Sequence, residues 1–530
     1  MPLNCLPWGR PAAHAAALLL LTLCARLAWS LPAASDPPLA VPELADLGPC
    51  EPSGRGRDYP VGTAPGQLSR LQDVPWERLR AGDTVRIHWR PEPWAGKLLL
   101  MAQGRQDAPV RLCGVPGPQG QRPVVTGQGA RTRRALGPHY GGNEYARVIH
   151  ESRAVLTLKS SARGAWTEVP TWLVVDGLAL RGAHPRHHFV DSQGVRRPFE
   201  AFGACVWVER GHHVRLENND ISDCTHAVFS RSTDDGDFAV TRDLWLRRNH
   251  LHGNGVAGDE KVHTTYLQSV GVVVEFNHYG PLRDGALGNA LKDRSVGTVV
   301  RYNRIEGGAH SLDLVEAEDY PATALADPAY RQAFVYGNQI LKDGRTGSAI
   351  HYGGDHYGSA PGAAWGEPLF RQGTLHFFHN SVRLTGGDGT LLQLSTTLEQ
   401  AELWNNIIHF EPATPHMRLR ASSEVAPPWV AGGVVRLGAH WLSAGWVDSD
   451  PWHPVPGQLS LQATPVLGET LPLRPDSWRP LADGGAVDAG QRGAPAAAQG
   501  HPVRWQLDAQ GRPERRRLRG GAPDLGAVER

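Results

Sequence analysis

A pattern of alternating apolar and polar residues recurs along the middle of the chain, and each time it leads into an asparagine. Two or three apolar alternations are followed by Asn, by one further residue and by another apolar one, as in VRLENNDI, LWLRRNHL and VVRYNRI. The asparagines are Asn219, Asn249, Asn277, Asn303, Asn338, Asn380 and Asn406, spaced by 30, 28, 26, 35, 42 and 26 residues. Period-2 alternation predicts short strands, and a repeat of this length predicts stacked structural units.

Apolar residues keep a fixed offset from each asparagine. Three positions before it stand Leu216, Leu246, Val274, Val300, Val335, Phe377 and Leu403, and two positions after it stand Ile221, Leu251, Tyr279, Ile305, Ile340, Val382 and Ile408. One repeat cannot bury its own apolar face, but stacked repeats complete a continuous core. The pattern predicts an all-β fold, a single-stranded right-handed parallel β-helix over residues 80–410. We expect the asparagines at one bend, because Asn tolerates left-handed backbone geometry and stacked Asn side chains can hydrogen-bond.

The segments on either side of the repeat have a different composition. Within and just after an N-terminal extension at 31–79, LSRLQDVPWERLRAGDTVRIH predicts an amphipathic helical cap that ends at Gly82 and leads into the first strand. Residues 411–530 lack the asparagine pattern and include Pro- and Ala-rich stretches such as GAPAAAQGHP. We expect this C-terminal region to be irregular and to pack along the coil and over its end.

The first 30 residues resemble a leader segment. An apolar run, AAHAAALLLLTLCARLAWS, closes on small residues, which predicts a secretory signal peptide at 1–30 with cleavage after Ser30. An uncleaved anchor helix is the alternative, but Arg26 interrupts the run. We therefore expect an exported protein, secreted or periplasmic, that does not contact a membrane after cleavage.

Composition narrows the possible partners. The 530 residues include 61 Gly and 42 Pro, which favours turns and strands, and the formal net charge is +1. A chain without a net field is not expected to bind nucleic acid, and we expect it to act as a monomer. Four cysteines follow the predicted leader, and the natural pairs are Cys50 with Cys113 and Cys205 with Cys224, with no zinc spacing among them.

Residues at equal offsets from the asparagines should lie above one another, about 4.8 Å apart in stacked strands. One predicted outward column reads Tyr266, Lys292, Asp313, His351 and Gln393; a second begins Gln268 and Arg294; a third, three positions back, reads His263, Asn289 and His310. Strand parity places Lys292 and Arg294 on the same outward face. The columns concentrate side chains suited to proton transfer, and the alternative is an ordinary solvated polar face.

The stretch NALKDRSVGTVVRYNRIEGG, residues 289–308, carries a family resemblance. Together with the stacked Asn repeats and the cap, it resembles pectate-lyase-like β-helix proteins that act on acidic polysaccharides, and most of all the chondroitinase B and alginate lyase family. The resemblance covers 80–410 as fold and only this short stretch as chemistry. It implies that Lys292, followed by RYN at 301–303, is the Brønsted base.

The next repeat departs from that family. The family has an Arg-His-Gly there that neutralises the sugar carboxylate, whereas this chain has SLDLVEA, with Asp313 and Glu316. The substrate carboxylate would then be met by Arg294, by another arginine, or by Ca²⁺ held on acidic residues. Two long segments between repeats, at 317–331 and 353–371, are predicted to wall a cleft beside the charged columns.

The leading functional prediction is a polysaccharide-degrading lyase that acts by β-elimination on a uronate-containing polysaccharide. Lys292 would be the base, with its pKa of about 10.4 lowered by repulsion from Arg294, and Tyr266 or His263 would protonate the leaving group. The predicted substrate contacts are Asp313, His310, His351, Glu316, Gln268 and Asn289. Three alternatives remain: a glycoside hydrolase that uses Asp313 and Glu316, a C5-epimerase with the same residues as the lyase, and a carbohydrate-binding coil without catalysis.

Overall fold

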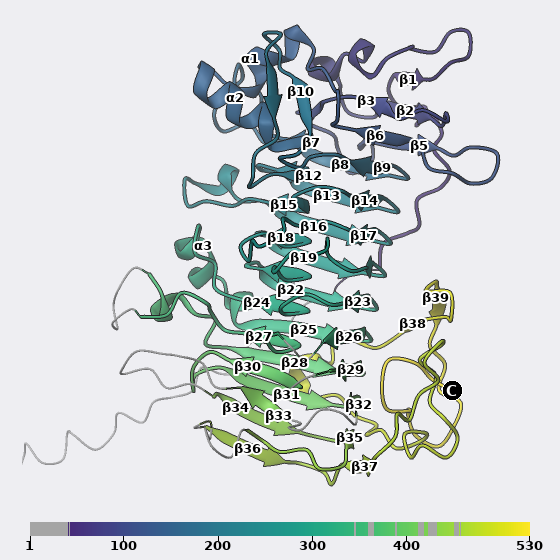
Figure 1. Ribbon diagram of the computed structural model, residues 1–530, viewed down its shortest axis with the longest axis vertical. Helices are drawn as coiled ribbons and strands as arrows, with labels where there is room; N and C mark the ends of the chain where they lie inside the picture. The colour runs from purple at the N-terminus through teal and green to yellow at the C-terminus, as the bar shows by residue number, and fades with distance from the viewer. Residues whose placement is uncertain are drawn as a thin grey trace, which may run out of the picture.

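The computed structural model describes residues 41, 43–343, 346–358, 365–386, 389–411, 418–421, 432–449, 455 and 457–530. The predicted signal peptide at 1–30 lies outside these residues. Figure 1 shows one long coil of stacked strands, with α1 (Gly137–Tyr140) and α2 (Glu144–Arg153) at its N-terminal end and α3 (Pro321–Ala326) on its flank. None of the helices in the described part of the chain has the length and apolar character needed to cross a membrane.

Within the described residues, parallel sheets of 13, 12 and 10 strands form the three faces of the coil, here named sheets A, B and C. Sheet A consists of β1 (Asp58–Val61), β2 (Thr84–His88), β5 (Val110–Val115), β8 (Thr171–Asp176), β13 (His212–Glu217), β16 (Arg242–Arg247), β19 (Val270–Glu275), β22 (Val296–Arg301), β25 (Gln332–Tyr336), β28 (Thr374–Phe378), β31 (Gln400–Trp404), β34 (Val434–Leu437) and β36 (Gln458–Leu461). Sheet B consists of β3 (Trp94–Ala95), β6 (Val124–Thr126), β9 (Ala179–Arg181), β14 (Asp220–Ser222), β17 (His250–His252), β20 (His278–Tyr279), β23 (Arg304–Glu306), β26 (Gln339–Asp343), β29 (Ser381–Thr385), β32 (Asn406–Phe410), β35 (His440–Ser443) and β37 (Val466–Gly468). Sheet C consists of β4 (Leu98–Leu100), β7 (Ala154–Leu158), β12 (Ala204–Val208), β15 (His226–Ser230), β18 (Thr265–Leu267), β21 (Leu291–Asp293), β24 (Leu312–Leu314), β27 (Ile350–Tyr352), β30 (Thr390–Leu394) and β33 (Arg418–Ala421).

Shorter elements decorate the coil. Two antiparallel hairpins are formed by β10 (His188–Val190) with β11 (Arg196–Pro198) and by β38 (Trp505–Leu507) with β39 (Pro513–Arg515). Single 3₁₀ turns are η1 (Leu71–Asp73), η2 (Trp76–Arg78), η3 (Arg134–Leu136), η4 (Asp237–Ala239), η5 (Pro328–Arg331), η6 (Glu367–Leu369) and η7 (Ala496–Ala498).

Each full rung of the coil follows the same path. The chain runs along a strand of sheet A, turns at the asparagine, and continues through short strands of sheets B and C before it returns to sheet A one rung further on. The repeat registers as the sequence predicts: Val274 pairs with Val300, and Tyr279 with Ile305. These side chains are buried in one continuous core. The right-handed parallel β-helix is therefore confirmed.

A ladder of buried amides joins the rungs. In the first six of the seven predicted asparagines, Asn219 to Asn380, the backbone N–H donates to the side-chain Oδ1 of the next asparagine at 2.8–3.0 Å. Each Nδ2 donates at 2.8–3.0 Å to the backbone oxygen that lies at the end of the preceding sheet A strand. At the last rung, Nδ2 of Asn406 lies 3.0 Å from Nε2 of His440, which stands in the place of an eighth asparagine.

The left-handed residue of the turn is not the asparagine that the sequence pattern suggested. It is the residue before it, with φ of 50–68° at Asn218, Arg248, Phe276, Tyr302, Gly337, His379 and Asn405. The ladder asparagine itself is selected by its buried hydrogen bonds, because its amide supplies both an acceptor and a donor. The preceding residue bears the backbone strain, and it varies freely because its side chain lies outside the ladder.

The helix predicted before Gly82 does not form. Residues 71–78 make only the two turns η1 and η2, because Pro75 lacks an N–H and Val74, just before it, is held in an extended conformation. The helices at the N-terminal end of the coil come later in the chain, as α1 and α2.

The coil also extends past the predicted limit of residue 410. Strands β34 and β36 continue sheet A, and β35 and β37 continue sheet B, without the asparagine pattern. The later chain packs on the outside of the coil, where Ala498 and Leu507 cover an aromatic row on sheet A that includes the stacked rings of Phe378 and Trp404.

Two disulfides join the predicted cysteine pairs. Cys50 bonds Cys113 and so ties the N-terminal extension to β5, and Cys205 in β12 bonds Cys224 just after β14. Each bond therefore links parts of the chain that lie on different elements, and such cross-links are typical of proteins in oxidising compartments.

Replacing one ladder asparagine tests how much the amides contribute. In Asn303→Ala, the N–H of Asn277 and the carbonyl of Val274 lose their partners in the core. A buried group left unpaired costs about 1–3 kcal/mol, so we expect a clearly lower thermal unfolding midpoint by circular dichroism. Arg304→Ala is the matched control, because the neighbouring Arg304 pairs with Glu306 on the outside. Equal midpoints for the two variants would contradict a structural role for the ladder.

Candidate functional site on the outer face of sheet C

The first predicted column exists as a row of aligned residues. Tyr266 pairs with Lys292, Lys292 with Asp313, Asp313 with His351, and His351 with Gln393, across β18, β21, β24, β27 and β30. Their side chains point out of sheet C, since the alternating neighbours such as Leu291 and Leu312 lie in the core. The register predicted from the asparagine spacing is therefore right.

The column does not line an open cleft, however. The side chain of Lys292 is 7% exposed and that of Asp313 is 2% exposed. Residues of the two long segments at 317–331 and 353–371 lie over the column: Glu318 bonds Tyr266, and Asp355 bonds Lys292. The two segments predicted to wall a cleft thus cover the column and bury it, because their acidic side chains bond the residues of the column.

Lys292 is held between two carboxylates. Its Nζ donates to Oδ2 of Asp313 at 2.8 Å and also to Asp355. Burial lowers the pKa of Lys292 and Arg294 repels its charge, but Asp313 and Asp355 outweigh both, so the pKa lies above its ordinary value. The expected fall in this pKa is therefore wrong for the arrangement seen here, in which Lys292 is a cation.

Arg294 is the centre of a second set of contacts. Nη2 donates to Oδ1 of Asp355 at 2.9 Å, Nη1 donates to Oε2 of Glu316 at 3.0 Å, and Nε donates to the hydroxyl of Tyr266 at 2.7 Å. Nε also lies 3.2 Å from Oε1 of Glu318. Because β24 ends at Leu314, Glu316 leaves the strand alternation and reaches the same site as Asp313. One carboxylate, that of Asp355, is thus bound jointly by Lys292 and Arg294.

His351 continues the column beyond Asp313. Its Nδ1 lies 2.9 Å from Oδ1 of Asp313, and its Nε2 lies 3.1 Å from Oγ of Ser395 and 3.2 Å from the hydroxyl of Tyr357. An Asp–His–Ser series suggests a hydrolytic triad. Ser395 is fully buried, though, and its Oγ lies 2.7 Å from the carbonyl oxygen of Gly354. No substrate carbonyl can reach this hydroxyl, and the series instead connects Lys292 through Asp313 to an imidazole.

The third column, three positions before the first along the chain, also forms. Nδ1 of His263 accepts the backbone N–H of Asn289 at 2.9 Å, and Oδ1 of Asn289 accepts the backbone N–H of His310 at 2.9 Å. Burial lowers the pKa of His263 well below its usual range and that of His310 to about 4. Both rings are neutral at pH 7, and the proton of His263 lies on Nε2 because Nδ1 is an acceptor. Gln268 is buried and donates to Asp319 at 2.5 Å.

Three site residues escaped the sequence reasoning: Glu318, Asp355 and His356. They lie in the long segments, where no register relates them to a neighbouring rung, and the only signal was the polar composition of GGDHYG at 353–358. Nδ1 of His356 lies 2.6 Å from Glu316 and Nε2 lies 3.0 Å from Glu318. Hydrogen bonds to these two carboxylates, opposed by burial, raise the pKa of His356 to about 10.

The same residues form a group that a cation could use. Ligand atoms of Glu316, Asp355 and His356 lie within 4.8 Å of one another. Carboxylates suit Ca²⁺, but Glu316 and Asp355 already bind the guanidinium of Arg294. A metal ion at this position would have to compete with Arg294 and with the proton of His356.

Exposed aromatic side chains flank the buried charges. The ring of Trp365, 52% exposed, lies 5.9 Å from His356, and the ring of Phe202, 41% exposed, lies 6.2 Å from Tyr266. Between them, Asp355, Glu318 and His356 are the partly exposed members of the network. A cavity of about 680 Å³ lies elsewhere, near the N-terminal helices, and is lined by Arg70, Arg131, Arg133 and Arg134 among others.

Comparison with known proteins finds similar chains only among solved structures. No family model matches it, and no curated protein matches it. Among solved structures it is similar to a GH136 lacto-N-biosidase from Eubacterium ramulus, at 13% identity over 78% of this chain and 68% of that one, with a TM-score of 0.37. It is also similar to an alginate lyase from Paenibacillus sp. (13% identity, 77% and 99% covered, TM-score 0.29) and to pectate lyase Pel9A (10% identity, 89% and 96% covered, TM-score 0.34). The closer likeness to chondroitinase B stays a prediction.

The raised pKa of His356 predicts a pH-dependent stability. A pKa raised from about 6.5 to about 10 gives a contribution that is complete below pH 6.5 and is lost as the pH rises through 10. The thermal midpoint of the parent should therefore exceed that of His356→Gln most at pH 6, and the difference should vanish above pH 10. Melting curves of both proteins at pH 6, 8 and 10.5 measure it. A difference that stays constant across this range would show that His356 is not held as a cation.

Proposed function

We propose that the chain is a polysaccharide-degrading enzyme of the parallel β-helix type, which acts on a uronate-containing polysaccharide by β-elimination. One observation carries the proposal: Lys292 in β21 and Arg294 just after it both bind the carboxylate of Asp355. A uronate presents the same planar, singly charged group, and charge-assisted bonds to a guanidinium are the usual means of recognising it. In this proposal, Asp355 holds the place of the substrate carboxylate.

The partly exposed side chain of Asp355 is the point at which a substrate carboxylate would enter the site. Asp355 is 25% exposed, whereas Lys292 and Arg294 beneath it are nearly buried. A sugar carboxylate that displaces Asp355 reaches Arg294 while Arg294 keeps its bond to Glu316. The exposed rings of Trp365 and Phe202 are suited to contact sugar rings on either side.

The displacement also prepares the base. With Asp355 displaced and the uronate carboxylate held by Arg294 alone, Lys292 loses one of the two carboxylates that raise its pKa, and Asp313 connects it to His351. As its pKa falls, Lys292 first releases its own proton to solvent. Arg294 then neutralises the uronate carboxylate, the neutral amine of Lys292 takes the proton from C5, and the bond from C4 to the leaving oxygen breaks as the C4–C5 double bond forms. Tyr266, whose pKa burial raises well above its usual range, holds the proton that the leaving oxygen needs.

Hydrolysis is a second candidate, favoured by a different observation. Glu318 and Asp355 are partly exposed carboxylates on opposite sides of His356, and glycoside hydrolases use two carboxyl groups about 5–9.5 Å apart. The originally predicted pair is less suited, since Asp313 and Glu316 are buried and bound to cations. Elimination remains the main proposal because Glu318 and Asp355 both contact Arg294, which favours their ionised forms, so neither carboxyl is suited to act as the general acid.

Export forms part of the proposal. It is supported by the two disulfides and by the predicted leader, since polysaccharides of this kind lie outside the cytoplasm.

The products of digestion distinguish the reactions. We expect the protein to produce ultraviolet-absorbing unsaturated ends from at least one of alginate, pectate or a glycosaminoglycan. New reducing ends without that absorbance would instead indicate hydrolysis, and binding without any product would indicate a carbohydrate-binding coil.

Variants of Lys292 test the proposed base. Lys292→Arg keeps a cation between Asp313 and Asp355, so the fold should persist, but activity should fall about a hundredfold or more because arginine does not release its proton. Lys292→Ala should lose activity and also melt earlier, because leaving buried carboxylates unpaired costs about 3–5 kcal/mol. Near-parental rates in Lys292→Arg would make Lys292 a binding residue and shift the base to His263 or His310.

Removing the charge of Asp355 tests whether the substrate carboxylate displaces this residue. In Asp355→Asn the pKa of Lys292 should fall, since one of its two carboxylates is gone, and the rising limb of the pH–rate profile should shift to lower pH. The KM for the acidic polymer should fall too, because the competing carboxylate is absent. Asp319→Asn is the matched control, as Asp319 bonds Gln268 beside the site. A complete loss of turnover in Asp355→Asn alone would support Asp355 as a hydrolytic carboxylate.

A further inference from the structure

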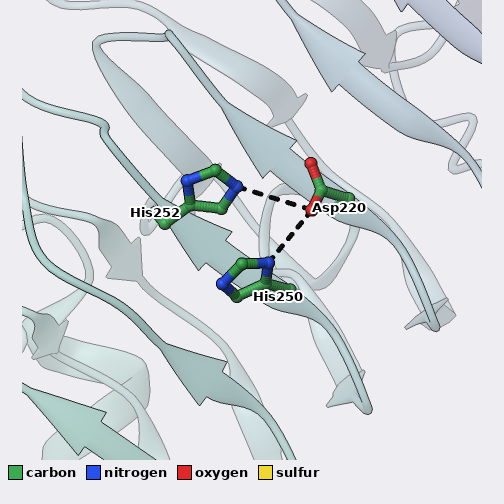
Figure 2. Close-up of side chains that lie close together, drawn as sticks. All are labelled: Asp220, His250 and His252. Carbon is green, nitrogen blue, oxygen red and sulfur yellow. Dashed lines mark hydrogen bonds and ion pairs between the residues drawn. The ribbon is translucent and has the colours of Figure 1, made fainter.

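A second cluster of polar side chains lies on another face of the coil. Asp220 opens β14 and pairs in register with His250, the first residue of β17. His252 lies two residues further along β17, so it points out of the same face of sheet B. Figure 2 shows the two imidazole rings side by side, each with a nitrogen directed at the carboxylate of Asp220. None of these residues takes part in the site on sheet C.

The three ligand atoms have the spacing of a metal site. Nδ1 of His250 lies 3.0 Å from Oδ2 of Asp220, and Nε2 of His252 lies 3.4 Å from the same oxygen. Two ligands bound tetrahedrally at 2.0–2.1 Å from Zn²⁺ are about 3.3 Å apart. All three atoms lie within 4.8 Å of one another. An ion can therefore bind by small shifts of side chains that already converge.

The surroundings favour a cation. The carboxylate of Asp220 lies between the two imidazoles, with Oδ2 facing both. Its buried Oδ1 receives no hydrogen bond from any residue in the described part of the chain, and Arg181 lies 3.6 Å away from it. The rings of His250 and His252 are more than a third exposed, so an ion from solvent can reach them.

Neighbouring rungs hold the rings in place. The ring of His278, one rung further on, stacks on His250 with centroids 4.9 Å apart, and His250 stacks on His252 at 4.1 Å. Beside His252 the next rung has Gly280, where an added Cβ would lie 3.0 Å from the Cβ of His252 and 3.6 Å from Nε2 of His250. The absence of a side chain at Gly280 leaves the two rings room to approach an ion.

We propose that Asp220, His250 and His252 bind a divalent transition-metal ion, with Zn²⁺ as the preferred ion, through Oδ2, Nδ1 and Nε2 respectively. Two imidazoles and one carboxylate suit Zn²⁺ rather than Ca²⁺ or Mg²⁺, which prefer oxygen ligands. Three protein ligands leave a fourth position for water. The bound ion joins two adjacent rungs, since its ligands come from β14 and β17.

Metal titration of the full chain, prepared without a polyhistidine tag, tests this site. Calorimetry with Zn²⁺ should give one site per chain, and Co²⁺ in its place should give the visible absorption of a tetrahedral ion. Zn²⁺ should also raise the thermal midpoint of the parent, because an ion that binds only the folded state stabilises it. His252→Gln and Asp220→Asn should each weaken Zn²⁺ binding at least about tenfold, since even loss of an outer partner of a metal ligand costs 10–100-fold.

His213→Asn is the matched control. His213 pairs with Asp243 at 2.9 Å on the exposed surface, but no second histidine joins them in the described structure. Asn also tolerates the left-handed backbone that His213 adopts. This variant should bind Zn²⁺ like the parent. Parental affinity in both His252→Gln and Asp220→Asn, or no zinc binding by the parent at micromolar concentrations, would overturn the proposal. All the substituted side chains point outward, and unchanged circular dichroism would verify that each variant is folded.

Discussion

The buried amide ladder is the interaction on which the rest of the molecule depends. Each rung turns sharply between sheets A and B, and that turn leaves backbone groups inside the core, where unpaired polar groups are costly. The side chain of Asn303, for example, accepts from Asn277 and donates to the carbonyl of Val274 in the preceding rung, and its Nδ2 also donates to Oδ1 of Asn338 in the next. Register is therefore fixed rung by rung, and a slip of one residue would break both kinds of bond and reverse every side chain. Fixed register is what aligns outward residues into columns.

Long insertions are compatible with this ladder only between the strands. The segments at 317–331 and 353–371, the second described at 353–358 and 365–371, follow sheet C strands and precede sheet A strands, and the pairing of β22, β25 and β28 is unchanged across them. Their acidic residues then meet the basic residues of the column, and a face that would otherwise be solvated becomes a buried ionic network. Such a network gives a precise geometry, but every charge in it needs a partner, so a ligand can enter only by replacing one. Asp355 is the most exchangeable partner, because its side chain is partly exposed to solvent and it binds both Lys292 and Arg294.

Residues in the strands could be placed from the sequence, whereas residues in the long insertions could not. The spacing of the asparagines predicted the register of Tyr266, Lys292, Asp313 and His351, because stacked residues keep equal offsets. The burial of the column, the raised pKa of Lys292 and the roles of Asp355 and His356 were not predictable, since residues in long insertions have no offset to count. The predicted cap helix does not form because Pro75 interrupts it, and this effect of Pro75 could have been predicted from the sequence. Asp220 and His250 each directly follow a ladder asparagine, so their alignment could have been predicted from the same offsets. The sequence analysis considered only the outward columns of sheet C, where titratable side chains are concentrated.

The two outer faces make opposite demands on the same scaffold. On sheet C, two basic residues two positions apart, Lys292 in β21 and Arg294 just after it, collect acidic partners, and the exchangeable group is an anion. On sheet B, an acidic residue on one rung meets two imidazoles on the next, and the three side chains converge on a point where we propose that a metal ion binds. Both arrangements require side chains from neighbouring rungs to converge within about 3–4 Å, which is less than the separation of about 4.8 Å between their backbones. Side chains can close that gap reproducibly only where the register is fixed. The ladder therefore determines the chemistry on both faces, although none of its asparagines takes part in either site.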